Sequence, residues 1–128
     1  MVAQPAGKRP RILLADDHPQ IIAATKRLLI AMDYDVVGAV ADGEQLLKTA
    51  EELQPDLVIV DLNLPKLNGL MACRQLRHAH PNITVILFTA GTVAGLAEAA
   101  HAAGAAALVM KHSMGGELLA VIKSAFHE

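Results

Sequence analysis

Short apolar runs alternate along this chain with segments in which apolar residues recur every three or four positions. Each run is the length of a β-strand, and the runs cover residues 12–15, 36–40, 57–60, 83–88 and 106–110. The runs are continuously apolar, whereas a strand with one face in water alternates apolar and polar residues. Continuous runs are typical of a parallel sheet that helices cover on both faces. The pattern therefore predicts an α/β domain.

A segment with helical spacing follows each run, and these segments cover residues 21–32, 46–53, 70–76, 93–103 and 118–126. Three of them are followed by residues that stop helices: Pro55, Pro81 and Gly104. A closed α/β barrel needs eight strand–helix units and about 250 residues, which excludes it here. We expect a flavodoxin-like, doubly wound five-stranded parallel sheet in the order 2-1-3-4-5, with five helices.

Composition bounds the class of protein. The chain of 128 residues is 53% hydrophobic and 19% charged, which suffices for one hydrophobic core and excludes a disordered protein. Its mean hydropathy is +0.37, yet no apolar run approaches the ~18 residues of a membrane-spanning helix. We expect residues 1–10 to form a mobile tail and residues 11–128 to form one domain.

Two further features bear on location and partners. A single cysteine, Cys73, forms neither an intrachain disulfide nor a cysteine-rich zinc site, which fits a reducing cytoplasm. The net charge of −2 argues against nucleic-acid binding through a broad basic surface. We therefore expect a cytoplasmic protein whose own surface binds neither membrane nor nucleic acid.

Polar residues follow four of the five predicted strands. Asp16 and Asp17 follow the first strand, Asp61 the third, Thr89 the fourth and Lys111 the fifth. Open α/β sheets bind ligands outside the carboxyl ends of their strands, where the strand order reverses. In the order 2-1-3-4-5 that point lies between the first and third strands. We expect the three aspartates to converge there, with Thr89 and Lys111 beside them.

These residue types together suit phosphoryl transfer. Three carboxylates held together repel one another, and Lys111 supplies only one positive charge. Ligation by oxygen atoms suits Mg²⁺ or Mn²⁺, and no histidine or cysteine pattern here suits zinc better. An aspartate beside such an ion, a hydroxyl and a lysine is equipped to attack phosphorus and form an acyl phosphate.

Each aspartate also has a purely structural interpretation. Asp16 or Asp17 alone could cap the helix that begins near Pro19. Asp61 alone could start a turn with Asn63 and Pro65. The constellation as a whole, on the right neighbouring strands, favours the functional interpretation.

Over residues 11–126 the chain resembles the receiver domain of two-component response regulators. The matching stretches are residues 12–18 (ILLADDH), residues 56–65 (DLVIVDLNLP), Asn68-Gly69, Thr89-Ala90, Gly104-Ala105 and Lys111. His18 after the acidic pair, and a residue other than proline after Lys111, are similar to the subgroup whose receivers precede helix-turn-helix DNA-binding domains.

The resemblance implies a role for each matching residue. Asp61 would accept phosphate from a histidine kinase or phosphotransfer protein. Asp17 and Asp61 would bind Mg²⁺, Asp16 would act largely through water, and the backbone carbonyl of Asn63 would complete the ligand set. Lys111 would pair with one phosphoryl oxygen, and Thr89 would bind another and move inward.

The resemblance also implies partners. The movement of Thr89 would reshape the face made by the fourth helix, fifth strand and fifth helix, where partners or a second copy dock. Leu108 stands where the family usually carries an aromatic residue, so the relay from Thr89 to that face is expected to be muted or different. DNA contacts would need a domain beyond these residues, so a single-domain regulator and a receiver of a longer protein both stay open.

Two other functions were weighed. A phosphatase with an aspartate nucleophile needs a second acid two residues after the first, but Asn63 follows Asp61 at that spacing. A flavin- or nucleotide-binding module needs a glycine-rich phosphate cradle after the first strand, where this chain has Asp16-Asp17-His18-Pro19. We expect a phosphoacceptor that assists its own modification, not an enzyme acting on a separate substrate.

Overall fold

The computed structural model describes residues 9–91 and 94–126. Five strands form one sheet, and they are β1 (Arg11–Ala15), β2 (Asp35–Val40), β3 (Leu57–Asp61), β4 (Thr84–Thr89) and β5 (Ala107–Met110). Five α-helices accompany them, and they are α1 (Pro19–Ala31), α2 (Gly43–Leu53), α3 (Gly69–Ala79), α4 (Leu96–Ala102) and α5 (Leu119–Phe126). The strands are parallel and lie in the order β2-β1-β3-β4-β5, which confirms the predicted fold.

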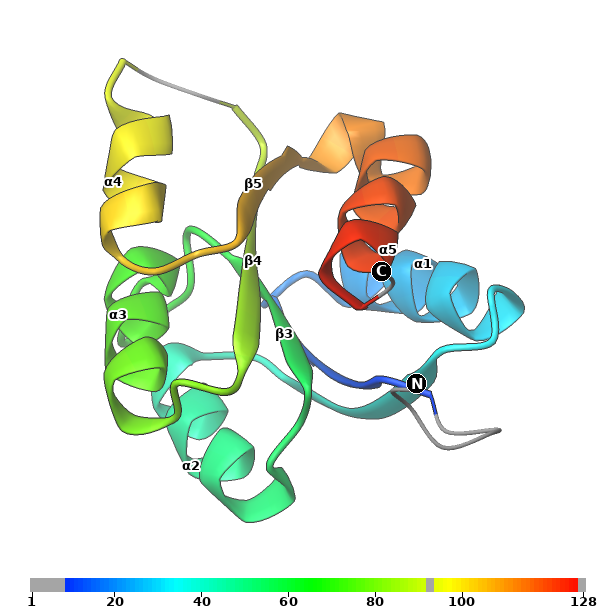
Figure 1. The fold of residues 1–128 in the computed structure, drawn as a ribbon, viewed down its shortest axis with the longest axis horizontal. Helices are drawn as coiled ribbons and strands as arrows, with labels where there is room; N and C mark the ends of the chain where they lie inside the picture. The colour runs from blue at the N-terminus through cyan, green and yellow to red at the C-terminus, as the bar shows by residue number, and fades with distance from the viewer. Residues whose placement is uncertain (1–8, 92–93, 127–128) are drawn as a thin grey trace.

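Helices cover both faces of the sheet, and each face has its own apolar core. In Figure 1, α2, α3 and α4 lie on one side of the strands and α1 and α5 on the other. Alternate residues of β1 serve the two cores, with Leu13 facing α2 and α3 and Leu14 facing α1 and α5. All five residues of β3 are buried, as expected for the central strand of a covered sheet.

The helix starts follow from local chemistry. Pro19 occupies the first turn of α1, where its missing N–H costs no hydrogen bond. The Asp42 carboxylate caps α2 by accepting the backbone N–H of Gln45 at 2.8 Å, and the Asn68 side chain caps α3 through Met71 at 2.9 Å. These caps explain why α2 begins three residues, and α3 one residue, before its apolar stripe.

The structure differs from the sequence-based boundaries in two places. The helix expected over residues 93–103 spans Leu96–Ala102, and Val93 lies outside the described residues. The segment before α5 forms a 3₁₀ turn (Lys111–Ser113) and a π-helical turn (Met114–Leu118). Gly115 and Gly116 are poor helix formers, which accounts for this irregular entry into α5.

The start of the domain is anchored to the neighbouring strand. The Pro10 carbonyl accepts the backbone N–H of Asp35 at 3.3 Å, and Arg9 pairs with Asp33 at 2.8 Å. The rest of the expected tail, residues 1–8, lies outside the described residues. Within the described residues, no helix combines the length and the apolar character needed to cross a bilayer.

Gly104 is required where α4 turns back into β5. Its φ angle is +94°, and a Cβ atom there would lie 2.8 Å from Cγ of Arg77. The Arg77 guanidinium is fixed in turn, since it donates to the carbonyl oxygens of Pro81 and Ile83. A side chain at position 104 therefore meets both backbone strain and a side chain that is held in place.

We predict that Gly104→Ala lowers the free energy of unfolding by about 1–3 kcal/mol, measured by urea denaturation. Gly116→Ala is the matched control, because a Cβ atom at Gly116 would meet nothing within 4 Å. The control is expected to leave stability unchanged or to raise it by up to about 1 kcal/mol, because alanine forms helices better than glycine. Equal effects of the two substitutions would contradict this account of Gly104.

Candidate functional site

The strand register brings the predicted site residues to one edge of the sheet. Ala15 of β1 pairs with Val60 of β3, so the next residues, Asp16 and Asp61, emerge side by side. On β4 and β5, Thr89 pairs with Met110, and Lys111 follows Met110 directly. The carboxyl edge thus carries all four groups in adjacent positions, as the sequence predicts.

Lys111 bridges two buried carboxylates. Its Nζ atom lies 2.9 Å from Oδ2 of Asp16 and 3.3 Å from Oδ1 of Asp61. The Asp16 and Asp61 side chains are only 4% and 3% exposed, and that of Lys111 is 13% exposed. Buried charges are stable only when paired, so one ammonium group here serves two carboxylates.

The pKa values of Asp61 and Lys111 are both shifted by burial and by the neighbouring charges. Burial, followed by the negative charge of Asp16, raises the pKa of Asp61, while Lys111 and the backbone N–H of Asn63 act in the opposite sense. Burial alone would lower the pKa of Lys111, but its hydrogen bond to Asp16 and the charge of Asp61 outweigh burial and raise that pKa. The lysine is therefore firmly cationic, whereas ionised Asp61 is under-compensated.

A divalent cation fits the remaining donor atoms. Among the described residues, Asp16, Asp17, His18 and Asp61 each offer one ligand atom, and these atoms lie within 4.8 Å of one another. Oδ2 of Asp61 is buried and has no hydrogen-bond partner in the described part of the chain. An ionised buried oxygen without a partner is costly, and a bound cation would satisfy it.

His18 belongs to this cluster, although the sequence analysis left it out. Its Nδ1 atom lies 2.8 Å from Oδ1 of Asp16 and 3.2 Å from Oδ1 of Asp17. The hydrogen bond to Asp16 and the charges of both aspartates raise the pKa of His18. The signal in the sequence is its place directly after the acidic pair, at the start of the helix that begins at Pro19.

The loop after β3 is held by close backbone contacts. A Cβ atom on Gly69 would lie 2.3 Å from the carbonyl oxygen of Asp61, so only glycine permits this approach. The backbone N–H of Leu62 donates to Phe88 at 2.8 Å, and that of Gly43 donates to Pro65 at 3.1 Å. These contacts fix the backbone on either side of Asn63, the predicted carbonyl ligand.

Thr89 lies at the edge but does not face the carboxylates. The residue is buried, and its hydroxyl donates to the backbone carbonyl of Gly91. The same hydroxyl accepts the backbone N–H of Gly91 at 3.3 Å. The structure thus brings Thr89 to the predicted strand end and ties its side chain to the loop that follows β4.

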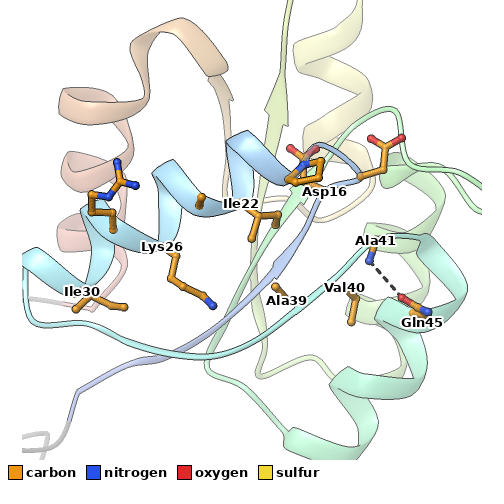
Figure 2. A pocket seen from close by; sticks show the side chains of 12 residues that line it. Asp16, Ile22, Lys26, Ile30, Ala39, Val40, Ala41 and Gln45 are labelled. Atoms are coloured by element: carbon orange, nitrogen blue, oxygen red, sulfur yellow. Dashed lines mark hydrogen bonds between the residues drawn. The ribbon is translucent and has the colours of Figure 1, made fainter.

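A groove begins at the acidic end of the site and runs along α1. It has a volume of about 600 Å³, and Figure 2 shows Ile22, Lys26 and Ile30 of α1 facing Ala39 and Val40 of β2. Asp16 and Asp17 line one end of the groove. A partner seated in this groove would therefore reach the carboxylates directly.

Fold and site together define a doubly wound α/β domain with acidic residues and a lysine at its switch point. Nucleotide-binding domains of the same architecture place a glycine-rich phosphate cradle there instead. The chain belongs to the response regulator receiver domain family, which matches residues 12–123. Membership confirms the resemblance and favours a receiver over the phosphatase and nucleotide-binding alternatives.

Similar proteins are response regulators. Response regulator GacA of Pseudomonas viridiflava is 35% identical over 117 residues, covering 91% of this chain and 55% of GacA. The DNA-binding transcriptional activator EvgA of Escherichia coli (strain K12) is 30% identical over 113 residues, covering 88% of this chain and 55% of EvgA. A crystal structure of a LuxR-family two-component response regulator from Aurantimonas sp. SI85-9A1 is also similar, with 33% sequence identity and a TM-score of 0.86. The match covers 92% of this chain and 85% of that chain. The chain spans about half the length of these curated relatives.

We predict that Asp61→Asn raises the free energy of unfolding at pH 7 without divalent cations, by on the order of 1 kcal/mol. Because the pKa of Asp61 is raised above its ordinary value of 3.8, the ionised carboxylate costs stability in the folded state. That cost is absent below the ordinary pKa and complete above the folded-state pKa. In urea denaturation with EDTA, the gain in stability should therefore shrink as the pH is lowered from 7 toward the ordinary pKa of 3.8.

Asp33→Asn is the control for this measurement, since the Asp33 side chain is 84% exposed and pairs with Arg9 at the surface. No gain in stability is expected from it. A loss of stability in Asp61→Asn at pH 7 would contradict the crowding of charge at this edge.

Proposed function

We propose that this domain is a phosphoacceptor switch in a two-component phosphorelay and that Asp61 accepts the phosphoryl group from a histidine kinase or phosphotransfer protein. The unpartnered Oδ2 of Asp61, beside the ammonium group of Lys111, is the observation that carries this proposal. Residues 11–128 form the receiver domain in this proposal, and we place it in the cytoplasm. Family membership supports both statements.

The reaction uses groups that already lie together. Oδ2 of Asp61 attacks the phosphorus of a phosphohistidine, an acyl phosphate O–P bond forms, and the P–N bond breaks as the histidine nitrogen takes up a proton. Lys111 then pairs with a phosphoryl oxygen. The reaction alters the protein itself, so the domain assists its own phosphorylation and dephosphorylation without being an enzyme for another substrate.

Asp16, Asp17, Asp61 and the backbone carbonyl of Asn63 would hold Mg²⁺, with Mn²⁺ as a substitute. The ion, when bound, supplies positive charge beside the phosphoryl oxygens. The burial of Asp16 and Asp61 and the shortage of cations at this edge support this assignment. The close backbone contacts of Leu62 and Gly69 hold the loop that carries Asn63.

Thr89 would transmit the change. To hydrogen-bond a phosphoryl oxygen, its hydroxyl must leave Gly91, and this exchange moves the loop between β4 and α4. The face made by α4, β5 and α5 then changes its contacts with a partner or a second copy. Leu108 on β5 is half-buried and packs against the core, so it fills space without an aromatic ring.

A second candidate is that this domain is the receiver part of a longer DNA-binding transcriptional regulator. Two facts favour it: this chain covers about half of GacA and of EvgA, and EvgA is a DNA-binding transcriptional activator. DNA contacts would then come from residues beyond this chain. The chemistry at Asp61 is the same in both candidates.

Incubation with acetyl phosphate and Mg²⁺ should add one phosphoryl group, detected by intact mass and labile to hydroxylamine. Asp61→Asn should abolish this uptake because the nucleophilic carboxylate is gone. Asp33→Asn, remote from the site, should be modified as the parent protein is. Stoichiometric uptake by Asp61→Asn would contradict the assignment.

Thr89→Val should leave phosphoryl uptake intact but prevent the rearrangement of α4, since valine has no hydroxyl for the phosphoryl group. NMR chemical shifts of α4 amides, recorded with and without beryllofluoride, measure this rearrangement. Thr84→Val, at the opposite end of β4, should respond as the parent protein does. An unchanged α4 response in Thr89→Val would remove Thr89 from the switch.

A further inference from the structure

The imidazole of His18 is placed among the acidic side chains as a metal ligand would be. Ligands about 2.1 Å from one ion lie roughly 3.0–4.2 Å apart in tetrahedral and octahedral sites. The distances from Nδ1 of His18 to Oδ1 of Asp16 and Asp17 are 2.8 Å and 3.2 Å. The fourth residue of the cluster, Asp61, has its donor atom within 4.8 Å of the others. The spacings of these four donor atoms thus lie near those of ligands around one ion.

His18 does not serve the helix that it precedes. It occupies the N-cap position of α1, where Ser, Thr, Asp and Asn are preferred because their side chains accept helix N–H groups. The His18 side chain makes no such bond, and its backbone carbonyl alone accepts the N–H groups of Ile21 and Ile22. Its side chain turns toward the carboxylates instead.

Two observations independent of His18 favour a cation site at this cluster. Oδ2 of Asp61 is buried, unpartnered within the described residues, and belongs to a residue only 2% exposed. Asp16, Asp17 and Asp61 carry three negative charges when ionised, against one positive charge on Lys111. With His18 neutral, as a metal-ligating imidazole must be, the remaining charge matches one dication.

We infer that His18 is a ligand at this site and makes it prefer first-row transition dications over Mg²⁺. The inference rests on the proposed function, since it concerns the same carboxylates. Mg²⁺ favours oxygen ligands and keeps several waters, whereas imidazole nitrogen suits Ni²⁺, Co²⁺ and Zn²⁺. One nitrogen among carboxylate oxygens therefore strengthens binding of the transition ions and contributes little to Mg²⁺ binding.

This assignment would add a nitrogen ligand to the set of oxygen ligands expected from the sequence. If His18 were only a hydrogen-bonding support for Asp16, its removal would weaken all dications alike, because it would act through the carboxylate. A ligand role predicts a change in the ratio of affinities. The ratio for Ni²⁺ against Mg²⁺ is therefore the decisive quantity.

Calorimetric titration of the untagged chain with NiCl₂ and with MgCl₂ tests the inference. In His18→Ala the affinity for Ni²⁺ should fall by at least about tenfold, while that for Mg²⁺ changes by less than about twofold. His101→Ala, which removes an exposed imidazole from α4, should leave both affinities unchanged. The Co²⁺ absorption spectrum should also shift in His18→Ala and not in His101→Ala.

Equal losses for Ni²⁺ and Mg²⁺ in His18→Ala, or no loss for either, would overturn the ligand role. Normal Mg²⁺ binding and phosphoryl uptake in the same samples would show that the proposed function still stands. Phosphoryl uptake by Asp61→Asn would instead overturn the proposed function, whatever His18 does. Failure of the parent protein to bind any dication would overturn both.

Discussion

Three carboxylates share one edge of the sheet with a single ammonium group, and the remaining features of the site follow from this shortage of positive charge. Lys111 lies within 3.3 Å of both buried aspartates and cannot neutralise both. Burial raises the pKa of Asp61 most, the negative charge of Asp16 raises it further, and its Oδ2 has no hydrogen-bond partner among the described residues. A cation relieves the shortage of positive charge, and a phosphoryl group brings in new charge that only Lys111, Thr89 and that cation can meet.

The fold brings these charged side chains together at one edge of the sheet and keeps the two cores apolar. The carboxyl ends of parallel strands lie at the same edge of the sheet. Polar residues that are far apart in the sequence therefore become neighbours there, while the core between the sheet and the helices stays apolar. Two continuous apolar cores, one on each face, hold the strands in register. Glycine at position 69 then lets the loop after β3 pass directly over the Asp61 backbone.

Much of this architecture was predictable from the sequence, because continuous apolar runs and strand-end polar residues are local signals. Asp16, Asp61, Thr89 and Lys111 were placed correctly at one edge, since register follows from the parallel order. The contact of His18 with Asp16 and Asp17 depends on the direction of a side chain at the start of a helix. The hydrogen bond between Thr89 and Gly91 depends on the geometry of the loop after β4. The periodicity of apolar residues predicts neither of these contacts. It also does not predict the π-helical turn before α5, where Gly115 and Gly116 weaken the helical pattern.

The most direct test of the central claim is an NMR titration of the chain with Mg²⁺. Amide signals flanking Asp16, Asp61 and Lys111 should shift together and follow one binding curve, while signals at the opposite ends of the strands stay in place. The shifts should disappear when EDTA is added. Signals at the carboxyl edge that stay unmoved by Mg²⁺ would contradict the claim that a dication balances the crowded carboxylates.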